Sequence, residues 1–387
     1  MLCYSLMPAT ADLLNRFADR LTNSKIKAFP IMRTDISGLD IRFHFRSTSF
    51  PGRFLTLKKG VPDGQLLSVQ LSLVCELVKN SDLIILLGIQ SLPALLTMVL
   101  ARLLNKPVLT INQTMPPAME RNRSWLIRWP KKFILRMTQL HVSQTKSTEQ
   151  TLKEVYGLRD DQLIYAPFDG GGQFFRLSLA QLPDTDKSKV REKFQTSPDA
   201  LIFLFVGTLI YLKGVDVLIN AFARLCSFYP NSSVWVVGAD GGTNGQLEQL
   251  RGQAQRLGIR DKVIFTGPRT LNELVDIYRS SDVFVLPTRK DVWPKVLVEA
   301  ALLRLPLITT PSNGCAHTLV QHEVNGFVVP VDDIDALANA MRRLTNAQIR
   351  KAMGNCSFEI VQDFLKPELE ADNIVEAIHT LLCKGGP

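Results

Sequence analysis

The sequence predicts an α/β protein made of two doubly wound domains, each a parallel sheet with helices on both faces. Strand and helix patterns alternate along most of the 387 residues, which is typical of parallel sheets. Some strands, such as Leu83–Leu87 and Leu201–Val206, are apolar throughout, as expected for strands buried on both faces. The chain is also longer than one core of ordinary size requires, so two domains are expected.

The N-terminal half alternates as follows. Apolar residues at helical spacing predict helices, and short apolar runs predict strands. The predicted elements are helix Asp12–Leu21, strand Ile41–Phe45, helix Gln65–Lys79, strand Leu83–Leu87, helix Leu92–Leu104, strand Pro107–Asn112, helix Trp125–Met137, strand Gln139–Ser143, helix Lys146–Tyr156 and strand Leu163–Ala166. The run Leu83–Leu104 resembles a membrane span, but Pro93 and Arg102 interrupt it, so a strand followed by a buried helix explains it better.

The C-terminal half alternates more regularly. Its predicted elements are strand Leu201–Val206, helix Val215–Leu225, strand Ser233–Val237, helix Gly245–Leu257, strand Val263–Phe265, helix Leu271–Ser280, strand Val283–Leu286, helix Val296–Leu303, strands Pro306–Thr309 and Phe327–Val331, and helix Ile334–Leu344. We expect an N-terminal domain at 1–176, a linker at 177–198, a C-terminal domain at 199–360 and a helix at 361–387 that packs back on the N-terminal domain. Two such domains leave a cleft between them, which is a preferred ligand site.

Composition narrows the class of protein. With 46% hydrophobic and 21% charged residues, the chain is globular rather than disordered. The six cysteines form no C-x-x-C pair and the five histidines have no metal-ligand spacing, so neither a disulfide framework nor a metal site is predicted. The N-terminus lacks a signal-peptide pattern, which favours a cytoplasmic protein.

Positive charge is concentrated in the N-terminal half. Residues 1–176 carry 23 Lys and Arg against 13 Asp and Glu, a net charge of +10, whereas the remainder has a net charge of −1. This asymmetry predicts that the N-terminal half faces an anionic partner.

Residues 121–136 contribute much of this excess and interleave basic with aromatic side chains. The basic residues are Arg121, Arg123, Arg128, Lys131, Lys132 and Arg136, and the apolar ones include Trp125, Leu126, Trp129 and Phe133. The pattern suits an anionic membrane surface, where the rings lie at headgroup depth. The alternative is a core helix with a solvated basic face. Nucleic acid is not predicted, because no recognised binding module accompanies the charge.

A loop after the first strand of the C-terminal half suits phosphate. Gly207 ends the strand Leu201–Val206, and Lys213-Gly214 opens the following helix. A glycine lets backbone approach a ligand, and a lysine at a helix start adds a cation where the helix dipole is already positive. The alternative is an ordinary strand-to-helix turn with an exposed lysine.

Two acids lie eight positions apart in a second loop and helix. Asp291 follows the strand Val283–Leu286, and Glu299 lies in the next helix. Asp291 has the chemistry to accept hydrogen bonds from sugar hydroxyls; alternatively it is a solvated loop charge or an N-cap. Glu299 follows Lys295 by four residues, so an i,i+4 ion pair is its structural alternative.

Together with Ala300, Pro306 and Asn325-Gly326, these residues resemble the retaining glycosyltransferases of family 4. The resemblance is strong from Leu201 to Leu344. It implies the GT-B fold, two Rossmann-like doubly wound domains facing across a cleft. It also implies transfer of a hexose from a UDP- or GDP-sugar to a glycan or polyprenyl-linked acceptor, in cell-surface polysaccharide or glycolipid synthesis. It implies no cofactor and, because an Asp-x-Asp motif is absent, no obligate metal.

The resemblance also assigns roles by position. Asp291 would contact the transferred sugar, Glu299 the nucleotide ribose and Lys213 the diphosphate, and these three form the expected catalytic set. The expected donor-binding residues are Gly207, Thr208, Lys213, Gly238, Pro268, Arg269, Trp293, Lys295, Val296, Leu297 and Glu299. Asn112, Gln113 and Thr114 end a strand of the N-terminal half and are expected on the acceptor side, whereas His141 is expected in the core.

Several positions depart from the family pattern. Thr208 stands where the family has arginine, Pro294 and Arg304 stand where it has glycine, and Met7-Pro8-Ala9-Thr10 replaces a Gly-Gly turn. We hypothesise that Lys295 supplies the cation missing at Thr208; the alternative is that Lys295 only pairs with Glu299. The departures leave two other functions open, an inactive nucleotide-sugar-binding partner subunit and a GT-B epimerase or phosphorylase.

Overall fold

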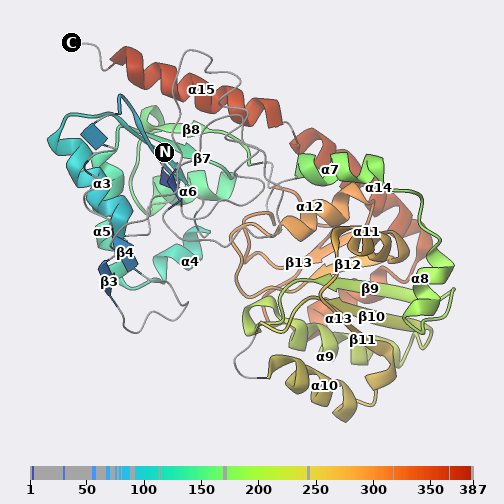
Figure 1. Cartoon of the computed structure of the whole chain (residues 1–387). Coiled ribbons are helices and arrows are strands. Elements are labelled where there is room, and N and C mark those ends of the chain that lie inside the picture. The colour runs from blue at the N-terminus through green and yellow to red at the C-terminus, as the bar shows by residue number, and fades with distance from the viewer. Residues whose placement is uncertain are drawn as a thin grey trace. The chain divides into compact units, whose positions relative to one another are not determined.

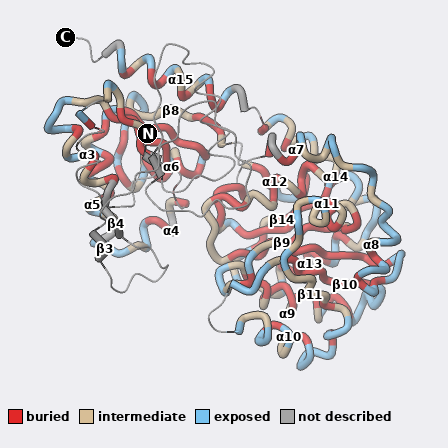
Figure 2. Tube along the Cα trace, viewed as in Figure 1, coloured by how far each residue is buried: buried red, intermediate tan, exposed pale blue. Residues whose placement is uncertain are grey.

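The computed structural model of the chain describes residues 81–87, 92–112, 114, 116–168, 172–241, 245–316, 318–365 and 367–384, and, nearer the N-terminus, residues 2–3, 29–30, 55–57, 67–69, 75 and 78–79 (Figure 1). Contacts divide the chain into an N-terminal unit, Met1–Asp169 with Pro367–Pro387, and a C-terminal unit, Gly170–Lys366. Each unit has its own sheet and its own buried core (Figure 2). Among the described helices, none is long and apolar enough to cross a membrane.

A parallel sheet forms the centre of the N-terminal unit. In the described residues its strand order is β2-β1-β5-β6-β7-β8. The strands are β1 (Leu2–Cys3), β2 (Phe29–Pro30), β5 (Ile84–Leu87), β6 (Val108–Asn112), β7 (Leu140–Ser143) and β8 (Leu163–Tyr165). All their described pairings are parallel, and described helices connect β5 to β6, β6 to β7 and β7 to β8. A separate antiparallel pair joins β3 (Leu55–Leu57) to β4 (Leu67–Val69).

Helices cover both faces of this sheet, because successive residues of a strand point to opposite sides. The helices are α3 (Leu92–Leu103), α4 (Pro117–Arg121), α5 (Trp125–Met137), α6 (Lys146–Glu154) and α15 (Pro367–Lys384). In β6, Leu109 and Ile111 share a core cluster with α15, whereas Val108 belongs to a cluster with α3, α5 and α6. A hydrogen bond also holds α15 to this sheet, from the Asn373 side chain to the Tyr165 carbonyl at 2.8 Å.

The C-terminal unit has a second parallel sheet with strand order β11-β10-β9-β12-β13-β14. The strands are β9 (Leu201–Val206), β10 (Ser232–Val237), β11 (Val263–Gly267), β12 (Val283–Leu286), β13 (Leu307–Thr309) and β14 (Gly326–Val328). The helices around it include α9 (Val215–Cys226), α10 (Gln246–Arg256), α11 (Leu271–Ser280), α12 (Lys295–Leu302), α13 (Ile334–Arg343) and α14 (Ala347–Phe364). In Figure 1, α9 and α10 lie on one side of the sheet and α11 and α12 on the other, which is the doubly wound arrangement.

The segment expected as a linker at 177–198 is instead largely helical and belongs to the C-terminal unit. It contains part of α7 (Gly172–Gln181) and all of α8 (Lys187–Lys193). The buried guanidinium of Arg191 anchors α8, since it donates to the Ser280 carbonyl at 3.0 Å and pairs with Asp282 at 3.1 Å. These partners lie about ninety residues away, so the local pattern did not reveal them.

Near the N-terminus, one predicted helix differs from the structure, and two predicted elements lie where the structure is not described. Within the predicted helix Gln65–Lys79, residues Leu67–Val69 form a strand, because pairing with β3 supplies backbone partners that the local sequence does not show. The predictions for Asp12–Leu21 and Ile41–Phe45 fall outside the described residues.

Candidate functional site

The strand ends at the carboxyl edge of the C-terminal sheet are closely packed backbone. Gly207 and Gly238 directly follow β9 and β10, and β11 ends at Gly267. The Gly238 amide donates to the Gly267 carbonyl at 3.1 Å, and a Cβ at Gly238 would lie 1.9 Å from the carbonyl oxygen of Gly207. Thr208 follows and is exposed, with its methyl group against Gly241. Gly238 therefore lets two neighbouring strand ends approach more closely than a residue with a Cβ would allow.

Lys213 lies at the end of a short turn that leads into α9. Gly214 caps the helix with a φ of 71°, and a Cβ there would lie 2.0 Å from the Pro287 carbonyl oxygen. Only glycine allows this contact, which brings the turn against the loop that follows β12. The Lys213 ammonium forms an ion pair with the Asp291 carboxylate. The structure therefore joins the two loops that the sequence singled out separately.

Arg289 fixes the loop that carries Asp291. Its guanidinium binds both carboxylate oxygens of Asp216 on α9, at 2.8 and 2.6 Å, and Asp332 at 2.7 Å. It also lies 3.9 Å above the Tyr211 ring centroid. Hydrogen bonding to Asp216 raises the pKa of Arg289 further. Arg289 was not among the predicted site residues, although its place two residues before Asp291 is a signal in the sequence.

Glu299 lies one turn into α12, and no side chain caps the start of this helix at Pro294. Tyr278 of α11 donates its hydroxyl to Glu299 Oε2 at 2.9 Å. Burial raises the pKa of Glu299, against the opposing effects of the Tyr278 hydrogen bond and the positive charge of Lys295. The positive charge of Lys295 thus acts on the ionisation of Glu299. Tyr278 was also not identified, because nothing in the local pattern connects residues 21 positions apart.

The other residues expected to bind the nucleotide sugar have structural neighbours different from those of Lys213 and Asp291. Trp293 is buried and packs against Phe364, with ring centroids 5.5 Å apart. Arg269, next to Pro268 after β11, donates to the Thr266 carbonyl at 2.6 Å. Its guanidinium also contacts Glu273 of α11, so it is occupied within the body of the domain rather than joined to the Lys213–Asp291 pair. Val296 and Leu297 lie in the uncapped first turn of α12.

The residues expected on the acceptor side belong to the N-terminal unit, and those that the structure describes are buried. Asn112 is only 2% exposed, and its amide donates to the Thr110 hydroxyl at 2.7 Å, so its side chain is directed into the interior. Thr110 in turn hydrogen-bonds His141, a core histidine as predicted, whose pKa is lowered by burial to about 4. Thr114 is buried, and its amide donates to the Thr148 hydroxyl at 3.0 Å. Gln113 lies outside the described residues.

Comparison with known proteins points to one family. Residues 186–357 match the family model described as Glycosyl transferases group 1. A D-inositol 3-phosphate glycosyltransferase from Geodermatophilus obscurus is 34% identical over 238 residues, which are 58% of this chain and 50% of that protein. The chain spans about half the length of the curated relatives it matches.

Solved structures resemble the whole chain. The HepE protein of Anabaena in complex with UDP has a TM-score of 0.76 at 18% identity, covering 98% of this chain and 99% of that one. A glycosyltransferase from Rickettsia africae has a TM-score of 0.73 at 16% identity, covering 98% and 97%. At these identities the likeness shows the fold alone. That fold is GT-B, as the sequence predicted, with a Rossmann-like parallel sheet in each unit.

Proposed function

We propose that this protein moves a sugar from a nucleotide-diphosphate sugar to an acceptor hydroxyl, because residues 186–357 match the model of the group 1 glycosyl transferases. The observation that carries the proposal is the ion pair between Lys213 and Asp291 at the carboxyl edge of the sheet. Asp291 precedes α12 by four residues, and no side chain caps the start of that helix. A cation and an open helix N-terminus suit a diphosphate, and a carboxylate suits sugar hydroxyls.

Each part of the nucleotide sugar then has a proposed partner in the protein. The diphosphate takes the Lys213 ammonium, with the amides of Lys295 and Val296 at the start of α12. The Leu297 amide, also expected there, already donates to the Pro294 carbonyl at 3.1 Å. The Asp291 carboxylate, released from Lys213, accepts hydrogen bonds from the transferred sugar. Glu299, held by Tyr278, accepts from the ribose hydroxyls. UDP and GDP are the donor nucleotides we favour; the Anabaena neighbour was crystallised with UDP and with UDP-glucose.

We propose a retaining transfer of a hexose. The bond between the anomeric carbon and the diphosphate breaks, negative charge grows on the leaving phosphate, and the new bond forms on the same face of the sugar. Lys213 and the α12 amides stabilise that growing charge and so lower the activation barrier. These groups are already in place, so they need not move during the reaction. The leaving phosphate helps to accept the proton of the acceptor hydroxyl. No cofactor or obligate metal enters this scheme.

We assign the acceptor to the N-terminal unit and propose that it is a glycan or a polyprenyl-linked glycan. We also propose that the protein acts in the cytoplasm, in the synthesis of a cell-surface polysaccharide or glycolipid. The net charge of +10 over residues 1–176 supports an anionic acceptor, since a lipid-linked glycan carries a diphosphate.

The first experiment screens UDP-, GDP- and ADP-sugars for an increase in melting temperature, followed by an assay of donor turnover. We expect one nucleotide to stabilise the wild type and to stabilise Lys213→Ala much less. Slow donor hydrolysis that disappears in Glu299→Ala would support an enzyme. Stabilisation without turnover under any condition would favour the inactive binding subunit that Thr208 and Pro294 left open. Turnover that needs no acceptor, or that needs free phosphate, would indicate an epimerase or a phosphorylase.

Lys295 is proposed as the substitute for the family arginine at Thr208. Lys295→Ala should weaken donor binding roughly tenfold, the effect of one hydrogen bond to a charged group. Lys290→Gln, a charge change in the preceding loop, is the matched control and should have little effect. Unchanged donor affinity in Lys295→Ala, together with lost binding in Lys213→Ala, would show that Lys295 serves only Glu299.

A further inference from the structure

The outward side of α5 carries two parallel rows of side chains. Residues four apart lie on the same side of a helix. Trp125, Trp129 and Phe133 form one row and are 66%, 64% and 48% exposed. Arg128, Lys132 and Arg136 form the adjoining row at the same spacing. We call these six residues, with the exposed Leu126, the α5 face.

The α5 face is not part of the hydrophobic core of the N-terminal unit. The opposite side of the helix is already packed inward, with Ile134 and Leu135 only 3% and 0% exposed. Lys131, expected among the surface cations, is instead buried and pairs with Glu120 at 2.9 Å. Exposed large rings that gather on one helix side indicate a surface for a partner.

The basic row has no acidic partner among the described residues. The neighbouring Arg121 and Arg123 do have one, because they pair with Glu154 and Glu120. Arg128, Lys132 and Arg136 make no such pair in the part of the chain that the structure describes. The α5 face therefore combines an apolar row with positive charge that no described carboxylate neutralises.

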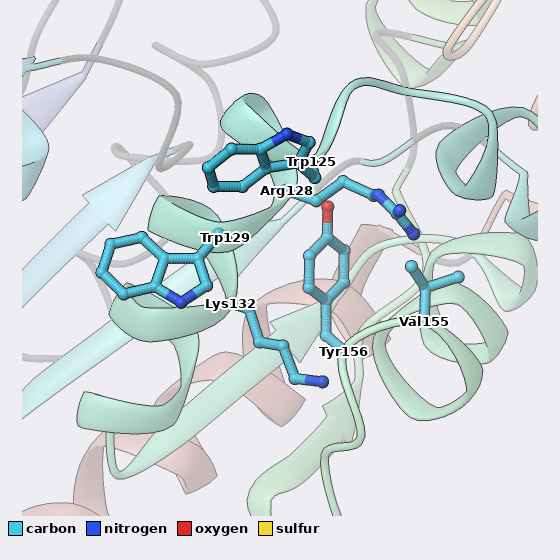
Figure 3. Close-up of a pocket in the computed structure, with 6 residues that line it drawn as sticks. All are labelled: Trp125, Arg128, Trp129, Lys132, Val155 and Tyr156. Atoms are coloured by element: carbon cyan, nitrogen blue, oxygen red, sulfur yellow. The ribbon is translucent and has the colours of Figure 1, made fainter.

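An open cavity of about 240 Å³ lies beside the two rows and is lined by Trp125, Arg128, Trp129, Lys132, Val155 and Tyr156 (Figure 3). In Figure 3 the guanidinium of Arg128 lies toward the hydroxyl end of Tyr156, and the ammonium of Lys132 lies toward the opposite end of that side chain. The Arg128 Nε is buried and has no hydrogen-bond partner within the described residues. The cavity thus offers two cations and an unused donor to an anion.

We propose that the α5 face docks on an anionic phospholipid bilayer. The rings enter the headgroup region, where amphipathic aromatic residues are stabilised, and Arg128 and Lys132 bind a lipid phosphate at the cavity. A single-stranded nucleic acid would need free ring faces for its bases. Trp129 and Phe133 instead stack on each other, with centroids 6.0 Å apart and planes 16° from parallel, on a convex helix. The proposal does not depend on the transferase activity.

Tryptophan fluorescence gives a direct test on the full chain without donor. The chain has four tryptophans, and the two outside the α5 face, Trp235 and Trp293, are buried. A blue shift on adding vesicles would therefore report Trp125 and Trp129. We expect the shift with phosphatidylglycerol vesicles, not with pure phosphatidylcholine, and expect it to weaken as salt is raised.

Variants separate the two rows in a vesicle co-sedimentation assay. Arg128→Gln/Lys132→Gln should weaken binding about 25-fold, roughly fivefold for each cation near the surface. Trp125→Ser/Trp129→Ser should also release the protein, because the apolar row is lost. Lys187→Gln/Arg256→Gln and Phe228→Ser change exposed residues of the same kinds elsewhere and should bind like the wild type. Circular dichroism melting curves establish that each variant is folded.

Three results would overturn the proposal. One is an absence of vesicle binding, or equal binding to anionic and neutral vesicles. Another is binding of single-stranded DNA, but not of vesicles, that depends on Arg128 and Lys132. The third is a dimer in analytical ultracentrifugation that Trp125→Ser/Trp129→Ser dissociates, which would make the α5 face a contact between two copies. Each result stands whether or not the protein turns over a nucleotide sugar, so it is distinct from failure of the proposed function.

Discussion

The Lys213 ammonium and the Asp291 carboxylate form an ion pair between the loops that follow the neighbouring strands β9 and β12. Their side chains are only 22% and 14% exposed. The cation proposed for the diphosphate thus has a carboxylate partner before the donor arrives. Donor binding exchanges this carboxylate for a phosphate oxygen and releases Asp291 for the sugar.

Asp291→Asn should therefore separate nucleotide affinity from transfer. Removing the competing charge should tighten binding of the free nucleoside diphosphate roughly fivefold, the effect of one partly exposed ion pair. Sugar transfer should fall sharply, because the proposed sugar contact is weakened. Isothermal titration with UDP and GDP measures the first effect, and Asp261→Asn is the exposed control. Equal or weaker nucleotide binding in Asp291→Asn would contradict this competition.

Gly214→Ala should displace the turn that carries Lys213. The new Cβ would meet the Pro287 carbonyl oxygen, and the φ of 71° is unfavourable as well. Gly258→Ala is a matched control, since Gly258 has a φ of 68° but no atom within 4 Å of a built Cβ. The control should lose about 1 kcal/mol of unfolding free energy from backbone strain, and Gly214→Ala at least about 2 kcal/mol more from the clash. Denaturant titration measures both, and equal losses would refute the close contact.

Arg289→Lys should loosen the loop that carries Asp291. A lysine cannot reproduce the two-pronged contact with Asp216 or the stacking on Tyr211. We expect a loss of about 2 kcal/mol in unfolding free energy and a higher KM for the donor. Arg224→Lys is the control, because its partner Asp335 is largely exposed and the pair should contribute little. A higher donor KM with unchanged melting temperature would place Arg289 in direct contact with the donor instead.

Tyr278→Phe should change the pH dependence of the donor kcat/KM. Burial already raises the pKa of Glu299, and loss of the hydroxyl that binds its carboxylate should raise it further. If the ionised form binds the ribose, activity falls as pH falls through this pKa, so the acidic limb should move to higher pH. Glu299→Gln should lower donor affinity roughly tenfold at neutral pH. Tyr229→Phe is the control, and an acidic limb that does not move in Tyr278→Phe would sink the assignment.

His141 should make stability depend on pH in the acidic range. Its pKa is lowered by burial from 6.5 to about 4, so between these values the unfolded chain binds a proton that the folded chain does not. The unfolding free energy should therefore fall as pH decreases from 6.5 to 4, with a slope of at most about 1.4 kcal/mol per pH unit from this group. His141→Asn keeps a nitrogen for Thr110 and should flatten this part of the curve. The exposed His379→Asn should leave the slope unchanged, and a wild-type slope in His141→Asn would refute the prediction.

Local periodicity was enough to locate most of the regular structure. α5, α11 and β12 have the predicted bounds, because their apolar spacing and their caps lie within the segment itself. The same local view failed at 177–198 and at Leu67–Val69. There, contacts with α11 and with β3 select the structure.

By itself the sequence determined the alternating α/β plan, the GT-B resemblance and the loops at the carboxyl ends of strands where the site residues occur. The tertiary structure alone decided which of these residues meet. Lys213 pairs with Asp291 across 78 positions because β9 and β12 are neighbours in the sheet, and strand order is not encoded in a local pattern. It also directed Asn112 inward, where Thr110 satisfies its amide, and it joined Tyr278 to Glu299. Burial and charge partners arise only when distant segments pack, so the electrostatics of the site belong to the fold.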